Sequence, residues 1–199
     1  SRTVGISNNN CNYIDENIIN TKKIGWKLKK IEIFSDNLKN EKILNFQKNN
    51  EQLFSVFKNF QLHELLNKSL SRNKFCKKLK FKYKPKSFDD YNLVFVTDPQ
   101  SMYTKKYFNK KIFKSYNSLA FTTTIKHEKI SNDVATQIFT KRGPLAFLPV
   151  SKKETSIVYS IPNSKKVIGQ NVNKLIQHYN FKYKIKKIDN INSFELKSF

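Results

Sequence analysis

Alternating apolar and polar positions mark two segments early in the chain. Ile31–Ser35 and Ile43–Phe46 follow the two-residue period that is typical of half-buried strands. The residues between them have the composition of a turn. The pattern therefore predicts a β-hairpin with a long connecting loop.

Helical spacing occurs twice. Leucines recur between Leu62 and Leu70 at positions that share one helix face, and Asn59 or Gln61 lies near the start of this pattern. Val167–Tyr179 carries a second apolar stripe of the same period. We expect a helix at each of these places.

The other apolar segments predict strands. They are Lys74–Lys86, a lysine-rich edge strand; Leu93–Val96, a buried strand; Ser115–Glu128, a long strand with one small, hydroxylated face; and Ala135–Phe139, Gly143–Pro149, Ser156–Ile161 and Phe181–Phe199. Two prolines bracket the apolar run in Gly143–Pro149, so we expect this strand at an edge or an end of a sheet. Strands that follow one another without helical crossovers imply an antiparallel sheet. The predicted fold class is therefore α+β.

Charge is the most unusual property of the composition. The 199 residues include 38 Lys or Arg and 15 Asp or Glu, which gives a formal net charge of +23. Of the bases, 35 are Lys, spread along the whole chain, whereas base-reading and bidentate phosphate contacts favour Arg. Frequent Lys, Asn, Ile, Phe and Tyr beside scarce Ala, Gly and Arg fit an AT-rich genome. Nucleic-acid binding is therefore disfavoured, and a lysine-rich nucleic-acid or anionic-surface binding module stays as the alternative.

The sequence lacks the motifs of several kinds of functional site. Cys11 and Cys76 have no CxxC partner, so we expect two buried thiols in a reducing compartment. The three histidines lack metal-ligand spacing, and no metal site is predicted. Isolated glycines form neither a dinucleotide-binding fingerprint nor a phosphate loop. No apolar run is long enough to span a membrane.

The most specific motif is Gly143–Pro149, which reads GPLAFLP and is followed by the strand Ser156–Ser160. Here the sequence resembles the 2-polyprenylphenol hydroxylases, the flavin-dependent aromatic hydroxylases of ubiquinone biosynthesis. Weaker matches occur in the family's order at Arg2–Ser7, Ile24–Trp26 and Leu93–Ser101. The resemblance spans nearly the whole chain.

This resemblance implies a fold like that of p-hydroxybenzoate hydroxylase, in which a FAD domain is interleaved with a sheet-rich substrate domain. Residues 1–92 would be a partial FAD-domain segment with the hairpin and a helix, and residues 93–199 the substrate-domain sheet with a helix. The glycine-rich FAD motif would lie upstream and a further FAD-contacting segment downstream. We therefore expect an internal fragment that alone neither holds FAD tightly nor turns over.

The resemblance also assigns roles to individual residues. Arg2 matches an arginine that approaches the pyrophosphate of FAD, and Asp98 matches an aspartate near the cofactor, although Pro99 stands where the family has Gly. In the GPLAFLP motif, the family places Gly143, Pro144, Leu145, Phe147 and Pro149 along the substrate cavity. No residue is expected to be catalytic, because the flavin carries the oxygen chemistry.

The activity implied is hydroxylation of a polyprenylated phenol with FAD and with NAD(P)H or another reductant. We expect a cytoplasmic enzyme that meets its membrane-resident quinone precursor peripherally at the inner membrane of a bacterium, where lysines are attracted to anionic lipid. A purely structural domain without a site of its own is a further alternative.

Overall fold

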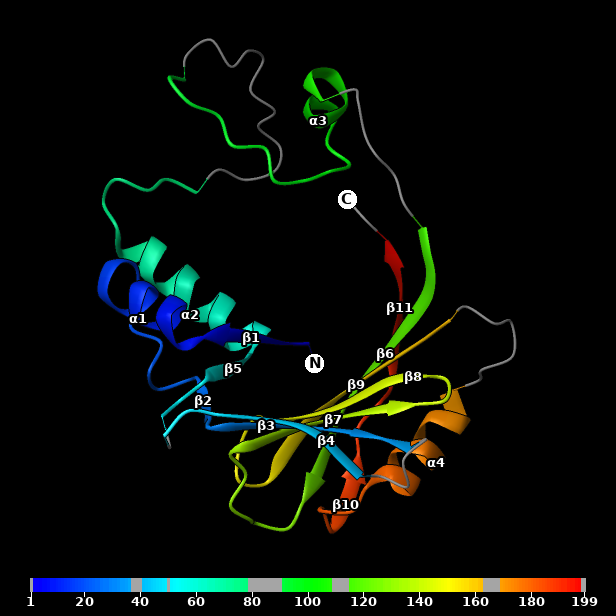
Figure 1. The fold of residues 1–199 in the computed structure, drawn as a ribbon. Coiled ribbons are helices and arrows are strands. Elements are labelled where there is room, and N and C mark those ends of the chain that lie inside the picture. The colour runs from blue at the N-terminus through cyan, green and yellow to red at the C-terminus, as the bar shows by residue number, and fades with distance from the viewer. Residues whose placement is uncertain are drawn as a thin grey trace.

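The computed structural model describes residues 2–36, 41–49, 51–78, 91–108, 115–162 and 169–197, which form two sheets and their helices (Figure 1). The strands are β1 (Thr3–Ser7), β2 (Trp26–Leu28), β3 (Lys30–Ser35), β4 (Glu41–Gln47), β5 (Phe54–Lys58), β6 (Ser115–His127), β7 (Val134–Thr140), β8 (Gly143–Pro149), β9 (Glu154–Pro162), β10 (Ile185–Ile188) and β11 (Asn192–Lys197). The helices are α1 (Asn8–Asn17), α2 (Asn59–Arg72), α3 (Met102–Tyr107) and α4 (Gly169–Tyr179). None of the helices in the described ranges is long and apolar enough to cross a bilayer.

The large sheet has eight strands in the order β10-β6-β9-β8-β7-β3-β4, and β11 also pairs with β6. Its pairs are antiparallel except β3 and β7, which run parallel with Ile31 opposite Ala135. The predicted α+β class and largely antiparallel sheet are confirmed. Because β3 and β4 join this sheet, it extends across the predicted boundary at residue 92, and the division into two domains stays a prediction.

Helix α4 covers one face of the large sheet and builds the main core. Its Val172 and Ile176 lie one helical turn apart and are buried against apolar side chains from the central strands. Leu145, Phe147 and Tyr159 are among the buried residues of this cluster. The core therefore lies between α4 and strands β6 to β9.

The small sheet has the order β1-β5-β2 and packs on the other face of the large sheet. Leu28 and Val56 from the small sheet are buried against Ala135 of β7. Ser7 caps the N-terminus of helix α1, because its hydroxyl accepts a hydrogen bond from the Asn10 amide. The patterns in the sequence did not predict α1 or the small sheet.

Three predictions about elements need correction. Leu93–Val96 is not a strand, and Leu93 and Phe95 are 69% and 82% exposed. Strand β8 lies between β7 and β9 in the sheet interior, because Pro144 and Pro149 fall near its two ends, where a missing N–H costs little. Cys76 is exposed, whereas Cys11 is buried as expected.

The remaining predicted elements are confirmed, with boundaries that differ by a few residues. They are the hairpin of β3 and β4, helices α2 and α4, and strands β6, β7 and β9 to β11. In the predicted lysine-rich strand, residues 74–78 form no strand, and residues 79–86 lie outside the described residues.

Candidate functional site

The face of the large sheet opposite α4 carries small and hydroxyl-bearing side chains. Cross-strand pairs place Thr122 opposite Val158 and Val158 opposite Ala146, and side chains of directly opposed residues share a face. We call this surface the hydroxyl face, and it comprises Ala120, Thr122, Thr124, Ala146, Ser156, Val158 and Ser160. It contains the small hydroxylated face that the sequence predicts for β6.

The small sheet covers one end of the hydroxyl face. Thr3 Oγ1 lies 3.0 Å from Ser156 Oγ, and Lys58 Nζ lies 2.5 Å from the Glu154 carboxylate. These contacts bury Ser156, whereas Val158, Ala146 and Ser160 beyond them stay half-buried. The accessible part of the hydroxyl face is therefore the part beyond β1.

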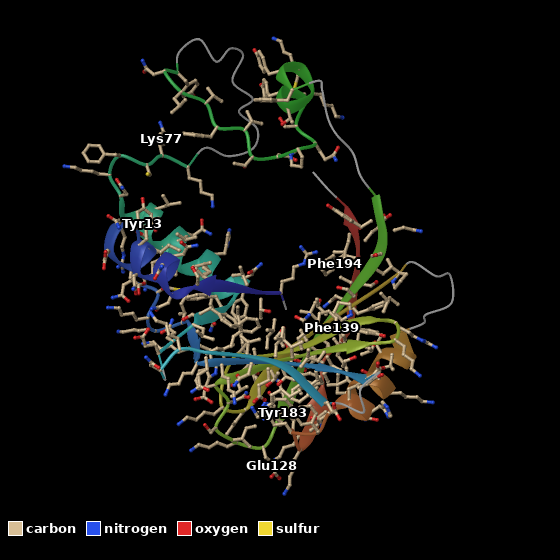
Figure 2. The ribbon with its side chains drawn as sticks, in the orientation of Figure 1. Tyr13, Lys77, Glu128, Phe139, Tyr183 and Phe194 are labelled. Carbon is tan, nitrogen blue, oxygen red and sulfur yellow. The ribbon has the colours of Figure 1, made fainter. Side chains whose placement is uncertain are left out.

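Arg2 reaches from the small sheet to the large one at this accessible part. Its guanidinium carbon lies 4.8 Å from the centroid of the Phe194 ring, in a cation–π contact. Phe194 of β11 pairs with Ala120, and Ala120 pairs with Ser160 of the hydroxyl face. In Figure 2, Phe194 lies on the side of the large sheet away from Tyr183. Arg2 is therefore an exposed cation beside the hydroxyl face.

Asp98 lies elsewhere and has a local structural role. Its carboxylate accepts a hydrogen bond from the Gln100 amide at 2.9 Å, and its carbonyl accepts one from Thr104 Oγ1 at 2.6 Å. This turn precedes α3, which lies apart from both sheets in Figure 1. The structure thus does not bring Asp98 together with Arg2.

The GPLAFLP motif forms β8, whose two faces differ. Leu145 and Phe147 are 0% and 2% exposed and pack in the core beneath α4, and Pro149 is buried too. Pro144 is exposed, and Gly143 is half-buried. The assignment of these five residues to a substrate cavity stays a prediction, and Pro144 offers the most accessible side chain among them.

Gly143 has a clear backbone reason to be glycine. Its φ is +143°, and a Cβ there would overlap the carbonyl oxygen of Ser160 on the neighbouring strand. The turn is closed by Thr140 Oγ1, which donates to the Gly143 carbonyl at 2.8 Å. This part of the motif therefore fixes the β7–β8 turn.

A buried polar network that no sequence pattern predicts holds one end of the large sheet. Tyr183 donates its hydroxyl hydrogen to Asn132 Oδ1 at 3.0 Å, and Asn132 Nδ2 donates to Thr155 Oγ1 at 3.1 Å. His127 Nε2 lies 3.0 Å from the same Thr155 hydroxyl, and Trp26 Nε1 donates to the Asn132 carbonyl at 2.6 Å. Burial raises the pKa of Tyr183 to about 12.

Two further groups have altered acidity outside the hydroxyl face. Tyr179 donates to Asp36 Oδ2 at 2.8 Å, and partial burial together with this carboxylate raises the pKa of Tyr179 to about 12. Burial also raises the pKa of the Cys11 thiol, which makes it a poor nucleophile at neutral pH. Both groups therefore support the fold.

No protein-family model and no curated protein matches this sequence. The fold, however, matches solved structures over almost the whole chain. HpxO from Klebsiella pneumoniae, solved in complex with FAD, matches with a TM-score of 0.66 and 11% identity over 99% of this chain and 60% of its own. A protein described as a FAD-containing monooxygenase from Photorhabdus luminescens matches with a TM-score of 0.61 and 12% identity over 98% of this chain and 65% of its own.

The chain has the fold of a FAD-dependent monooxygenase domain. It spans less than two thirds of the length of either matched protein. The predicted likeness to p-hydroxybenzoate hydroxylase is confirmed at the level of the fold.

The residues that could meet a flavin nucleotide differ in their fit. Arg2 is exposed, and the ion pairs found among the described residues do not include it. An exposed guanidinium beside an accessible sheet face suits a pyrophosphate. Asp98 already uses its carboxylate to hold a turn remote from this face. Arg2 therefore fits a cofactor contact better than Asp98 does.

Proposed function

We propose that this chain is part of a FAD-dependent monooxygenase that hydroxylates a polyprenylated aromatic ring in ubiquinone biosynthesis. The observation that carries the proposal is the fold match to two flavoproteins over at least 98% of the chain. The narrower substrate class rests on the GPLAFLP motif and on the ordered matches that begin at Arg2.

In this proposal Arg2 holds the cofactor by its charge. Its guanidinium would pair with the FAD pyrophosphate while Phe194 supports it from below at 4.8 Å. When bound, FAD supplies the redox chemistry that activates oxygen. Asp98 would help only indirectly, by keeping the turn before α3 in place.

The hydroxyl face would form the wall that orients the aromatic ring. Ser160 offers a hydroxyl group to a phenol oxygen, and Val158 and Ala146 offer apolar surface to the ring. Burial of Leu145 and Phe147 in the core keeps β8 rigid behind this wall. The small sheet would exclude water from one side, since it already covers Ser156.

A polyprenyl tail would keep the substrate in a bilayer, so the enzyme would work peripherally at an anionic membrane, with NAD(P)H or another reductant. The formal charge of +23 supports attraction to anionic lipid, about 1 kcal/mol for each Lys near the surface. Sedimentation of the full-length protein with vesicles of neutral and of anionic lipid measures this attraction.

Flavin content is the direct test of the proposal. The full-length protein that contains this chain is purified, and its visible absorbance is compared before and after the Arg2→Gln substitution. We expect bound flavin in the parent protein and weaker retention in the variant, because the charge opposite the pyrophosphate is lost. Arg72→Gln at the end of α2 is the matched control and should leave flavin content unchanged.

Two results would contradict the proposal. A correctly folded full-length protein without flavin, even after incubation with FAD, would remove its basis. The second result is a flavin-loaded protein whose NAD(P)H-dependent oxygen uptake does not respond to prenylated phenols. It would refute the substrate class, while the monooxygenase assignment would stand.

A further inference from the structure

Three lysine-rich segments meet at the end of the large sheet that is remote from Phe194. They are the end of β6 with the loop after it, the turn between β8 and β9, and the start of β10. Backbone hydrogen bonds tie them together, from His127 N to the Lys153 carbonyl at 2.9 Å and from Glu128 N to the Lys184 carbonyl at 3.2 Å. In Figure 2, Glu128 lies at this end of the sheet and Phe194 at the other.

These segments line an open hollow of about 510 Å³ on the surface. Four exposed lysines line it, namely Lys126, Lys129, Lys153 and Lys186. The volume falls in the range of small-molecule sites. The lysines come from different segments whose backbones are hydrogen-bonded to one another, so the backbone that carries them is held in place at this end of the sheet.

Two carboxylates also line the hollow, and each has a cation of its own. Glu154 pairs with Lys58 at 2.5 Å, and Glu128 lies 3.8 Å from Lys184. Neither Lys58 nor Lys184 is among the four lining lysines. The four lining ammonium groups are therefore in excess over the acids at this end.

We propose that this hollow binds anions that carry two or more phosphate groups. Several ammonium groups around one hollow match clustered negative charge better than a single charge, and lysine binds phosphate as a compact point charge. A free polyphosphate and the head group of a polyphosphorylated lipid share this chemistry. The site is separate from the accessible part of the hydroxyl face and does not depend on the proposed hydroxylase function.

Calorimetric titration with inorganic tripolyphosphate tests the site. The full-length protein is compared with a variant in which the four lining lysines are changed to Gln. Its control carries the same charge change at four exposed lysines elsewhere, Lys23, Lys68, Lys77 and Lys105. We expect the lining variant to lose about tenfold or more in affinity, the control less than about threefold, and binding to weaken with added salt.

Three outcomes would overturn the proposal: no binding by the parent protein, equal losses in both variants, or binding of a single-stranded oligonucleotide that is stronger than tripolyphosphate binding and insensitive to the lining variant. The first would show that the hollow binds no polyphosphate, and the second would show that binding depends only on the overall charge of the chain. Unchanged circular dichroism and thermal midpoints in both variants establish that the fold is intact. The lining variant should keep the flavin content of the parent protein, which separates this test from that of the flavin site.

Vesicles distinguish the two sources of the anion. Sedimentation with phosphatidylcholine vesicles, with and without phosphatidylinositol bisphosphate, is repeated in the presence of tripolyphosphate. Retention that depends on the bisphosphate lipid and is reversed by tripolyphosphate supports the site with a lipid as its ligand. Tripolyphosphate binding without vesicle retention supports the site with a free polyphosphate.

Discussion

Removing the hydroxyl of Tyr183 tests whether the buried network stabilises the fold. Tyr183→Phe removes the hydrogen bond to Asn132 Oδ1, and Asn132 is only 2% exposed. A buried acceptor left without its donor costs about 1–3 kcal/mol. We therefore expect the free energy of unfolding at pH 7 to fall by about that amount, measured by urea denaturation.

The same substitution should change how the free energy of unfolding falls at high pH. Tyrosine titrates near pH 10 in an unfolded chain, whereas the pKa of Tyr183 in the fold is about 12. The stabilisation from the neutral hydroxyl is therefore complete below pH 10 and is lost as the pH rises from 10 to 12. At pH 11 the loss is about 1.4 kcal/mol, and Tyr183→Phe should lack it.

A control separates this effect from general alkaline unfolding. Tyr13 is 63% exposed on α1, so Tyr13→Phe should keep both the stability at pH 7 and the alkaline loss of the parent. The reasoning is refuted if Tyr183→Phe unfolds at the same urea concentration as the parent at pH 7 and loses as much stability between pH 9 and pH 11.

Three further substitutions test other parts of the fold by urea denaturation. Gly143→Ala places a methyl group on a backbone with φ of +143° and against a carbonyl of β9, so we expect a loss above about 3 kcal/mol; a loss below 1 kcal/mol would contradict the strain argument. Phe147→Ala should cost about 3–5 kcal/mol because it opens a core cavity, whereas Leu44→Ala on the exposed edge strand β4 should cost under about 1 kcal/mol; similar losses would disprove the placement of the core. Thr3→Val removes the hydrogen bond to Ser156, and we expect a loss of about 1 kcal/mol; no change would mean that this contact adds nothing to the junction between the sheets.

The spacing of apolar residues was enough to predict those elements whose apolar residues share one face of the strand or helix. The alternation in residues 115–127 reflects a strand that has a partner on each side, and the leucines of α2 mark one helix face. Leu93–Val96 was wrongly predicted as a strand because four apolar residues carry no information about a partner strand, and no strand in the described ranges pairs with them. Strand β8 was misplaced because proline weakens a strand only where its N–H is needed.

The contacts that build the candidate sites were harder to predict because they join distant residues. Arg2 meets Phe194 across nearly the whole chain, and Thr3 meets Ser156. Asn132 occurs in an ordinary polar loop, and only the fold brings Trp26 and Tyr183 to it. The resemblance identified Arg2, Asp98 and β8 as candidates. Only the tertiary structure shows which side chains of β8 are buried and that Asp98 is not brought together with Arg2.

The parallel pairing of β3 with β7 has a consequence for how the chain folds. β3 and β4 are complete as a hairpin early in synthesis, but the partner of β3 is made only when residues 134–140 emerge. Until then β3 presents an unpaired edge, and joining it to β7 must close a very long loop at an entropic cost. High contact order of this kind slows folding. Docking of the hairpin onto β7 is therefore the step at which we expect the nascent chain to be most exposed to aggregation and most dependent on chaperones.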